Sequence, residues 1–245
     1  MTILTLFALF AAGLVAGGLT TVAGLGGGIL LIAGLSMVWS PAVVLGMTAP
    51  ALFVGNASRA AMMARAIDWP MVWRFSVTGI PTALAASLVA IYAPTAWIQL
   101  AIAALLLAFV AREVLAPRAS APAETGSPWL AAGAGAIAGT VSGLTGGAGF
   151  VATPLFDRLG LEPRSLVATT SACMGLVHLA KGIGFGMGQV LTPALWPAAA
   201  VLALGIVAGN AAGARVLAGL SREAFRRLLL GALALAALQL MASAL

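Results

Sequence analysis

Two glycine clusters interrupt apolar stretches at comparable positions in the two halves of the sequence. Their members are Gly24, Gly26, Gly27 and Gly28 in the first half, and Gly143, Gly146, Gly147 and Gly149 in the second. A helix that starts after such a break exposes unpaired N–H groups and a partial positive charge, and glycine lets a ligand approach the backbone. All of these glycines except Gly24 and Gly143 are candidate residues for binding an anion. The alternative is that they only allow close packing of membrane helices.

Polar side chains inside apolar segments form a second group of candidates, because intramembrane polar groups are costly and tend to mark solute pathways. Thr48 and Thr169 match when the sequence is shifted by 121 residues, and Thr170 and Ser171 follow the second threonine. Their hydroxyls could bind a solute, or they could bond to carbonyls of the preceding helical turn. Asn56 could bind a solute or a neighbouring helix.

Ionisable side chains within apolar segments are few. His178 is the only histidine, lies one position from Asn56 in the repeat alignment, and could carry a proton or serve as a structural imidazole. Lys181 and Arg59 could each attract anions, or could extend to the membrane interface. The single cysteine, Cys173, supports neither a disulfide framework nor a metal cluster. No nucleotide-binding motif is present, so use of ATP would require a partner subunit. The sequence predicts no cofactor and no metal.

Composition indicates which elements must position these residues. The chain is 62% hydrophobic and 7% charged, with a mean hydropathy of +1.12, whereas soluble domains are about 45–50% apolar and about 25% charged. The class is therefore an all-α polytopic membrane protein. The formal net charge of +6 does not indicate nucleic acid, because the basic residues cluster at segment ends and form no basic face.

A membrane core about 30 Å thick needs about 20 helical residues to cross it. The apolar segments of sufficient or near-sufficient length are 2–23, 41–64, 71–92 and 96–114 in the first half, and 129–142, 165–187, 194–217 and 225–245 in the second. Short runs at 29–39 and 150–159 follow the two glycine clusters and read as half-helices. We expect two repeats of about five helical segments, at 1–116 and 129–245, joined by a polar cytoplasmic linker at 117–128.

Charge predicts how the repeats sit in the membrane, because Lys and Arg collect in cytoplasmic loops. Arg59, Arg65 and Arg74 flank one turn of the first half, whereas its counterpart at 188–193 carries no charge. Other equivalent turns show the same opposition, so the two repeats are predicted to have inverted topology. Both termini are then non-cytoplasmic, and Lys181 is the one basic residue outside the cytoplasmic set. The six tryptophans all lie at segment edges, as expected for interfacial belts.

Two spaced motifs resemble those of the TauE/SafE family of membrane permeases, often called sulfite exporters. The first is GLGGGILLIAGL, followed by Thr48-Ala49-Pro50, Asn56, Arg59 and Ile67-Asp68-Trp69; the second is SGLTGGAGFVATPL, followed by VATTSA. The sequence departs from the family pattern at Ala33, at the Gly-Ala-Gly of the second motif, and at His178. The resemblance implies transport of sulfite, sulfoacetate or related organosulfur anions across the bacterial cytoplasmic membrane, usually as export.

The resulting hypothesis is a secondary transporter that moves a small anion by alternating access. Its expected partners are the anion and the lipid bilayer, and a coupling proton and a second copy of the chain are compatible with the sequence. Nucleic acid is not an expected partner. One alternative is a membrane assembly subunit that transports nothing. Another is an intramembrane hydrolase that uses Ser142 as nucleophile together with His178, although the spacing matches no nucleophile signature.

Overall fold

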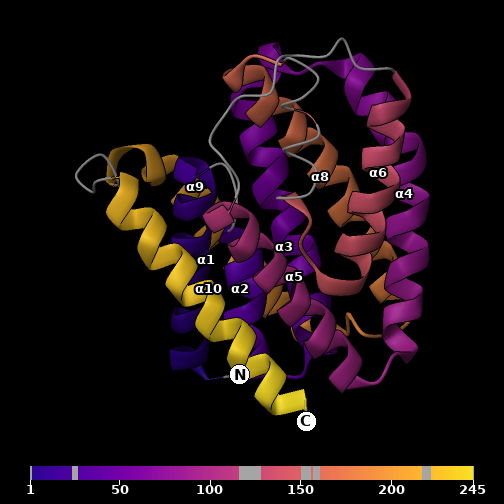
Figure 1. Cartoon of the computed structure of the whole chain (residues 1–245). Helices are drawn as coiled ribbons and strands as arrows, with labels where there is room; N and C mark the ends of the chain where they lie inside the picture. Colours follow the sequence, from indigo (N-terminus) through magenta and orange to yellow (C-terminus); the bar gives the residue numbers. More distant parts are fainter. Residues whose placement is uncertain are drawn as a thin grey trace.

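The computed structural model describes residues 2–23, 27–115, 128–149, 156, 161–216 and 222–244, and the regular secondary structure of this part of the chain is all helical, without strands. The helices are α1 (Ile3–Ala23), α2 (Gly27–Ser36), α3 (Pro41–Met62), α4 (Trp69–Tyr92), α5 (Thr95–Leu115), α6 (Pro128–Thr145), α8 (Pro163–Met187), α9 (Trp196–Val216) and α10 (Arg222–Ala244). Figure 1 shows their arrangement. The predicted all-α fold is confirmed.

Six of these helices contain a segment long and apolar enough to cross a membrane, among the residues that could be searched. They are α1, α3, α4, α5, α8 and α9. The 10 residues of α2 would extend only about 15 Å, so α2 cannot cross the bilayer by itself. The chain is therefore a multi-pass membrane protein that also contains a short buried helix, as predicted for the first repeat.

Local sequence signals start several of the long helices. Pro41 and Pro163 occupy the first turns of α3 and α8, where a missing N–H costs nothing. The side chain of Asp68 caps α4 by accepting a hydrogen bond from the backbone N–H of Met71 at 3.0 Å. These residues determine where each of the three helices begins, and therefore how it is positioned along the bundle axis.

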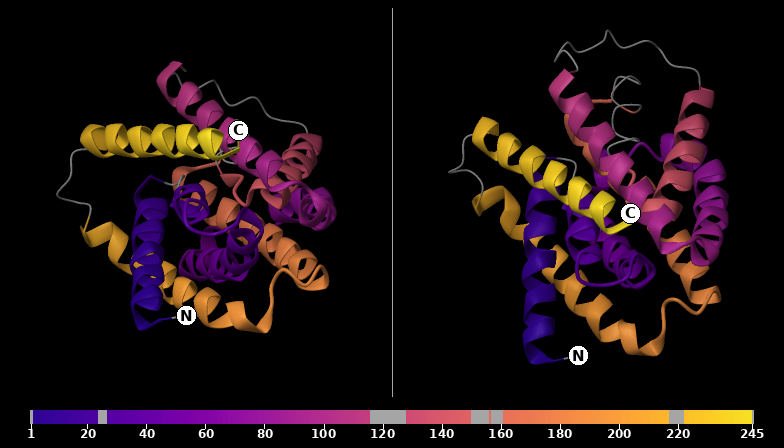
Figure 2. Two further views of the ribbon diagram at one scale, coloured as in Figure 1. Left: turned by 90° about the horizontal axis from the view of Figure 1, so that it is seen from below. Right: turned by 60° about the horizontal axis from the view of Figure 1, so that its bottom comes forward.

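The helices pack in pairs that the repeat alignment relates to each other. α1 packs extensively on α9, and α6 packs extensively on α4 (Figure 1). α3 contacts both α8 and α9, α8 contacts both α3 and α4, and α5 packs with α10 on one side of the bundle (Figure 2). The equivalent helices of the two halves are α1 and α6, α3 and α8, α4 and α9, and α5 and α10. If every helix is replaced by its equivalent, the same set of contacting pairs results.

Glycine allows the closest of these pairings. On α6, Gly135, Gly139 and Gly143 lie so close to α4 that an added methyl group would collide with backbone atoms of residues such as Phe75 and Gly79. Glycines of α1 and α9 meet in the same way, namely Gly13, Gly17, Gly205 and Gly209. Small residues at a four-residue spacing are a typical device for close helix contact in membranes. Gly143 therefore serves packing.

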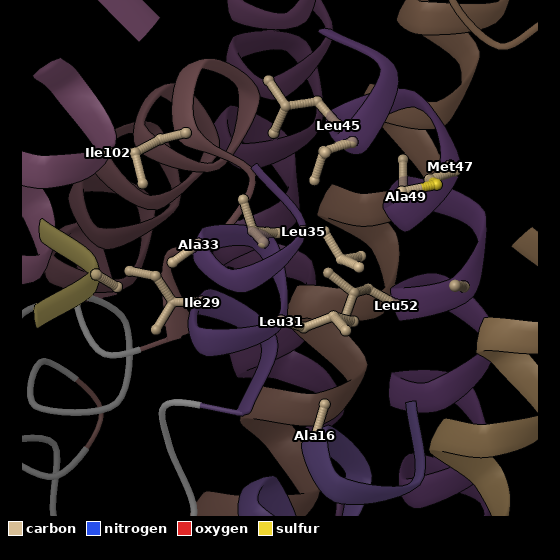
Figure 3. Close-up of a cluster of buried hydrophobic side chains, with 14 of the residues drawn as sticks. Ala16, Ile29, Leu31, Ala33, Leu35, Leu45, Met47, Ala49, Leu52 and Ile102 are labelled. Atoms are coloured by element: carbon tan, nitrogen blue, oxygen red, sulfur yellow. The ribbon is translucent and has the colours of Figure 1, made fainter. Parts of the chain in front are cut away.

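The short helix α2 lies inside the larger hydrophobic core. Figure 3 shows Leu31 beside Leu52 of α3, while Ile29 and Ala33 lie on the opposite side of α2. A methyl group added to Gly27 would collide with Ala16 and Thr20, so the start of α2 packs directly against the last turns of α1. α1 and α2 thus form a helical hairpin.

The two chain ends lie at the same end of the molecule (Figure 1). The α4–α5 and α8–α9 connections lie toward this end as well, whereas the α3–α4 connection and the first turns of α6 and α8 lie toward the other. Five tryptophans near helix starts are 53–81% exposed, namely Trp69, Trp73, Trp97, Trp129 and Trp196. This exposure suits aromatic side chains that contact the membrane interface.

Candidate functional site

The second glycine cluster ends α6. The last helical residue is Thr145, and Gly146 adopts a φ of +88° while its N–H donates to the carbonyl of Ser142 at 2.8 Å. This geometry is the usual termination of a helix by a left-handed glycine. A side chain at Gly146 would be strained and would also meet Leu45 and Ile32. The predicted interruption of the helix at this point is therefore present.

This interruption lies against the beginning of α2. A methyl group added to Gly147 would lie 3.4 Å from Cβ of Ile29 and 3.7 Å from its backbone nitrogen. Because α2 begins at Gly27, the N–H groups of its first turn lack partners within the helix. The second interruption thus adjoins the helix start that follows the first. Gly26 lies outside the described residues.

The other candidate glycines differ in their surroundings. Gly27 packs closely against α1. At Gly28, in contrast, an added methyl group would meet only the side chain of Leu52, at 3.3 Å. An added methyl group on Gly149 would have nothing within 4 Å. Among the described residues, space beside the backbone is therefore found at Gly149 and not at Gly27.

α3 and α8 cross antiparallel at the centre of the bundle. Gly175 of α8 lies opposite Asn56 of α3, with 3.7 Å between an added methyl group and Asn56 Cβ, and Gly182 lies opposite Ala49 at 3.8 Å. This register places Thr48 and Thr169 about 20 Å apart along the helices, at 1.5 Å per residue. The two matched threonines therefore do not converge on one small solute.

Lys181 of α8 connects this crossing to the second interruption. Its ammonium Nζ donates to the carbonyl of Gly146 at 2.6 Å, and the side chain is 0% exposed. An ammonium can donate three hydrogen bonds. The interpretation that Lys181 extends to the membrane interface is therefore wrong, because the side chain turns inward to the backbone at the glycine cluster.

Arg59 of α3 is buried in a similar way. Nη1 donates to the carbonyl of Thr20 and Nη2 to Oδ1 of Asn56, both at 3.2 Å, while Nε has no partner. Asn56 in turn donates to the carbonyl of Leu52 at 2.8 Å. Arg59 is 6% exposed, so it does not extend to the interface either.

Neither buried cation has an acidic partner in the described part of the chain, where Asp68, Glu113 and Glu162 lie at the ends of helices. A charged side chain at the centre of a bilayer costs several kcal/mol, roughly 2.5–3.5 on insertion scales, unless it is paired. Two buried cationic side chains therefore lie along the α3–α8 crossing without an acidic partner among the described residues.

The predicted hydroxyl ligands are engaged in different ways. Thr48 and Ser171 donate to carbonyls of their own helices, at Val44 and Val167, each at 2.7 Å. Thr169 accepts a hydrogen bond from the backbone N–H of Asp68 at 3.0 Å, which fastens the α3–α4 turn to α8. Of these four candidate hydroxyls, only the buried one of Thr170 lacks a hydrogen-bond partner within the described chain.

His178 lies one helical turn before Lys181, and its Nδ1 is buried without a partner. The hydroxyl of Ser142 is also buried without a partner, so it forms no hydrogen bond to His178. The nucleophile and base of the hydrolase hypothesis are therefore not joined in this structure.

A groove of about 700 Å³ between α1 and α2 is almost entirely apolar. Its wall extends from Ala16 and Gly27 to Leu4 and Trp39, with Thr5 contributing one hydroxyl. A surface of this kind offers no groups to balance the charge of an anion. The glycine interruption and the α3–α8 crossing are better placed for that purpose.

Comparison with known proteins identifies the relationship. A family model described as "Sulfite exporter TauE/SafE" matches residues 9–240. The chain belongs to the TauE/SafE family. This match covers both glycine clusters and both long central helices, α3 and α8, so the resemblance expected from the motifs is confirmed over nearly the whole chain. No curated protein and no solved structure matches the sequence.

Sequence reasoning missed one polar junction in this TauE/SafE protein. Asn210 of α9 donates to the carbonyl of Gly55 at 2.9 Å and to Ser58 Oγ at 3.1 Å, and its Oδ1 accepts from Thr21 at 3.2 Å. It thereby joins α1, α3 and α9 one turn from Arg59. An isolated asparagine within an apolar helix was the available signal.

Proposed function

We propose that this chain is a secondary transporter that exports a small anion, such as sulfite, sulfoacetate or a related organosulfur anion, across the bacterial cytoplasmic membrane by alternating access. Membership of the TauE/SafE family supports an anion exporter. The observation that carries the site assignment is the position of Gly147 beside the first turn of α2, where a methyl group added to Gly147 would lie 3.4 Å from Cβ of Ile29. Unpaired N–H groups at a helix start favour negative charge.

The repeats 1–116 and 129–245 are proposed to have inverted topology, with the linker 117–128 in the cytoplasm and both termini outside. Support comes from the helix pairs, since exchanging equivalent helices leaves the set unchanged. Further support is the position of both chain ends at one end of the molecule, with the start of α6 at the other (Figure 1). An odd number of crossings in each repeat requires that arrangement. Binding sites of inverted-repeat transporters lie where the repeats meet.

Gly149 and Gly28 also belong to the proposed site, because no backbone of another helix lies against either of them among the described residues. Thr170 and His178 contribute polar atoms that lack partners among the described residues. Thr48, Thr169 and Ser171 would bind the anion only after exchanging their present hydrogen bonds. Asn56 would bind the anion only after giving up its present hydrogen bonds to Arg59 and to the Leu52 carbonyl, and Gly146 would act by shaping the turn.

Flux through proteoliposomes tests the proposal. Labelled sulfite, sulfoacetate and a carboxylate are loaded, and efflux is compared for the wild type, Gly147→Leu and Gly133→Leu. Gly133 lies on α6 with nothing within 4 Å of an added methyl group, so it is a matched control. We expect Gly147→Leu to lower anion flux at least 10-fold, because the side chain fills the junction with α2. Equal flux in the two variants would exclude a site at Gly147.

Dependence of the flux on a pH gradient tests coupling to protons. A wild-type protein that moves none of these anions under any gradient would contradict the proposed function and favour a non-transporting assembly subunit.

A further inference from the structure

Each repeat places a cation one turn after a polar residue in its long central helix. Asn56 and Arg59 form this pair in α3, and His178 and Lys181 form it in α8. Both pairs have the same three-residue spacing, and a shift of 122 residues superimposes them. Residues three apart share a helix face. The sequence therefore carries the same arrangement, polar residue followed by cation, in both central helices.

Both cations hold a carbonyl at the end of a helix that precedes a glycine cluster. Arg59 donates to Thr20, within the last turn of α1, and Lys181 donates to Gly146, directly after α6. Carbonyls at helix ends lack intrahelical partners and carry partial negative charge. One interpretation is therefore that both cations have a structural role and cap these two helix ends.

The two cations differ in how completely they are satisfied. Arg59 has a side-chain acceptor, Asn56 Oδ1, in addition to the Thr20 carbonyl. Among the described residues, Lys181 has only the Gly146 carbonyl as acceptor, although its ammonium has three donors and the residue is 0% exposed. Nδ1 of His178, one turn away, is also buried and without a partner. Spare hydrogen-bonding capacity and uncompensated charge therefore coincide at Lys181.

Distance limits what one small anion can contact. From the α3–α8 register, Arg59 and Lys181 are offset by about nine residues, or about 13 Å along the helix axes. A small oxyanion cannot span that length. It would contact one of the cations at a time, and the less satisfied ammonium gains more from it.

We propose that Lys181 is the charge partner of the transported anion, holding it beside the Gly146–Gly147 interruption while keeping its contact with the Gly146 carbonyl. This inference rests on the proposed function. The ligand is a small oxyanion, whose oxygens accept hydrogen bonds from the two remaining N–H groups of the ammonium. The anion reaches Lys181 when the packing around Gly146 opens, because the ammonium is shielded from solvent in this conformation.

The wild-type protein provides a direct test, since Lys181 is the only lysine in the sequence. Protein labelled with ¹⁵N and ¹³C at lysine has one lysine side-chain signal by NMR. We expect that signal to shift saturably with sulfite or sulfoacetate, whichever the proteoliposomes transport, and to give the same Kd as a binding assay. An unchanged signal at a saturating concentration of a transported anion would overturn the inference while leaving the transport function intact.

Three variants separate binding from structural capping. We expect Lys181→Gln to raise the Kd for the anion about 10- to 100-fold, the value of a charge-assisted hydrogen bond, and Lys181→Arg to restore part of it. Arg59→Gln removes the other buried cap, and its Kd should stay within about threefold of the wild type. An equal rise in Kd in the Lys181→Gln and Arg59→Gln proteins would overturn the assignment, because either charge would then act only through the fold.

Discussion

Gly139 within α6 and Gly147 just beyond its end are eight residues apart, yet an added methyl group would meet different surroundings. At Gly139 it would collide with the Gly79 carbonyl and the Thr82 hydroxyl of α4. At Gly147 its nearest neighbour is Cβ of Ile29, at an ordinary contact distance of 3.4 Å. The first glycine lets two helices touch, whereas the second leaves a junction that a side chain could enter.

This difference shows that glycine serves two purposes in one short stretch of sequence. Contact between α4 and α6 is a property of the fold, and losing it should unfold the protein or rearrange the helices. Space at the interruption is not needed for packing, so filling it should alter transport before it alters stability. Variants at the two positions therefore test whether the two glycines serve different purposes.

The largest effect is expected for Gly139→Leu. The leucine side chain would enter the backbone of α4, and overpacking of a close contact costs about 1–3 kcal/mol for small excesses and more for an entire side chain. We expect a large loss of folded, monodisperse protein on size-exclusion chromatography after extraction in detergent. Gly133→Leu on the same helix should behave as the wild type. A normal yield of the Gly139→Leu protein would show that α4 and α6 are not in close contact.

An intermediate effect is expected for Gly146→Ala. The φ of +88° strains a residue with a Cβ by about 1–2 kcal/mol, and the methyl group would also press on the ends of the Leu45 and Ile32 side chains. These ends can move, which limits the additional cost. Thermal unfolding followed by tryptophan fluorescence should show a lower Tm than for the wild type. An unchanged Tm would indicate that Gly146 does not hold this backbone conformation.

Much of the fold follows from patterns that the sequence displays. The apolar segment expected at 41–64 is α3 (Pro41–Met62), and that expected at 165–187 is α8 (Pro163–Met187). Proline and the ends of apolar runs account for this agreement. The start of α4 was missed by two residues, because Asp68 caps the helix and Pro70 is tolerated in its first turn.

The site was less predictable, because its properties depend on which helix lies opposite. Gly27 and Gly147 both belong to glycine clusters, but only Gly27 has the backbone of α1 against it. Thr48 and Thr169 match in sequence, yet one bonds within its helix and the other binds the α3–α4 turn. The sequence shows how far along its helix Lys181 lies, but it does not show which way the side chain turns. That direction depends on the Gly146 carbonyl, which accepts a hydrogen bond from the ammonium.

The smallest change in stability is expected for Gly147→Ala. The methyl group fits at 3.4 Å from Ile29, and no positive φ has to be maintained, so the free energy of unfolding should change by less than about 0.5 kcal/mol. Anion efflux from proteoliposomes should nevertheless fall severalfold, because the added carbon narrows the approach to the first turn of α2. Normal flux would show that the solute does not use this junction, whereas reduced flux at unchanged Tm would indicate that the junction is used by the solute or must move during transport.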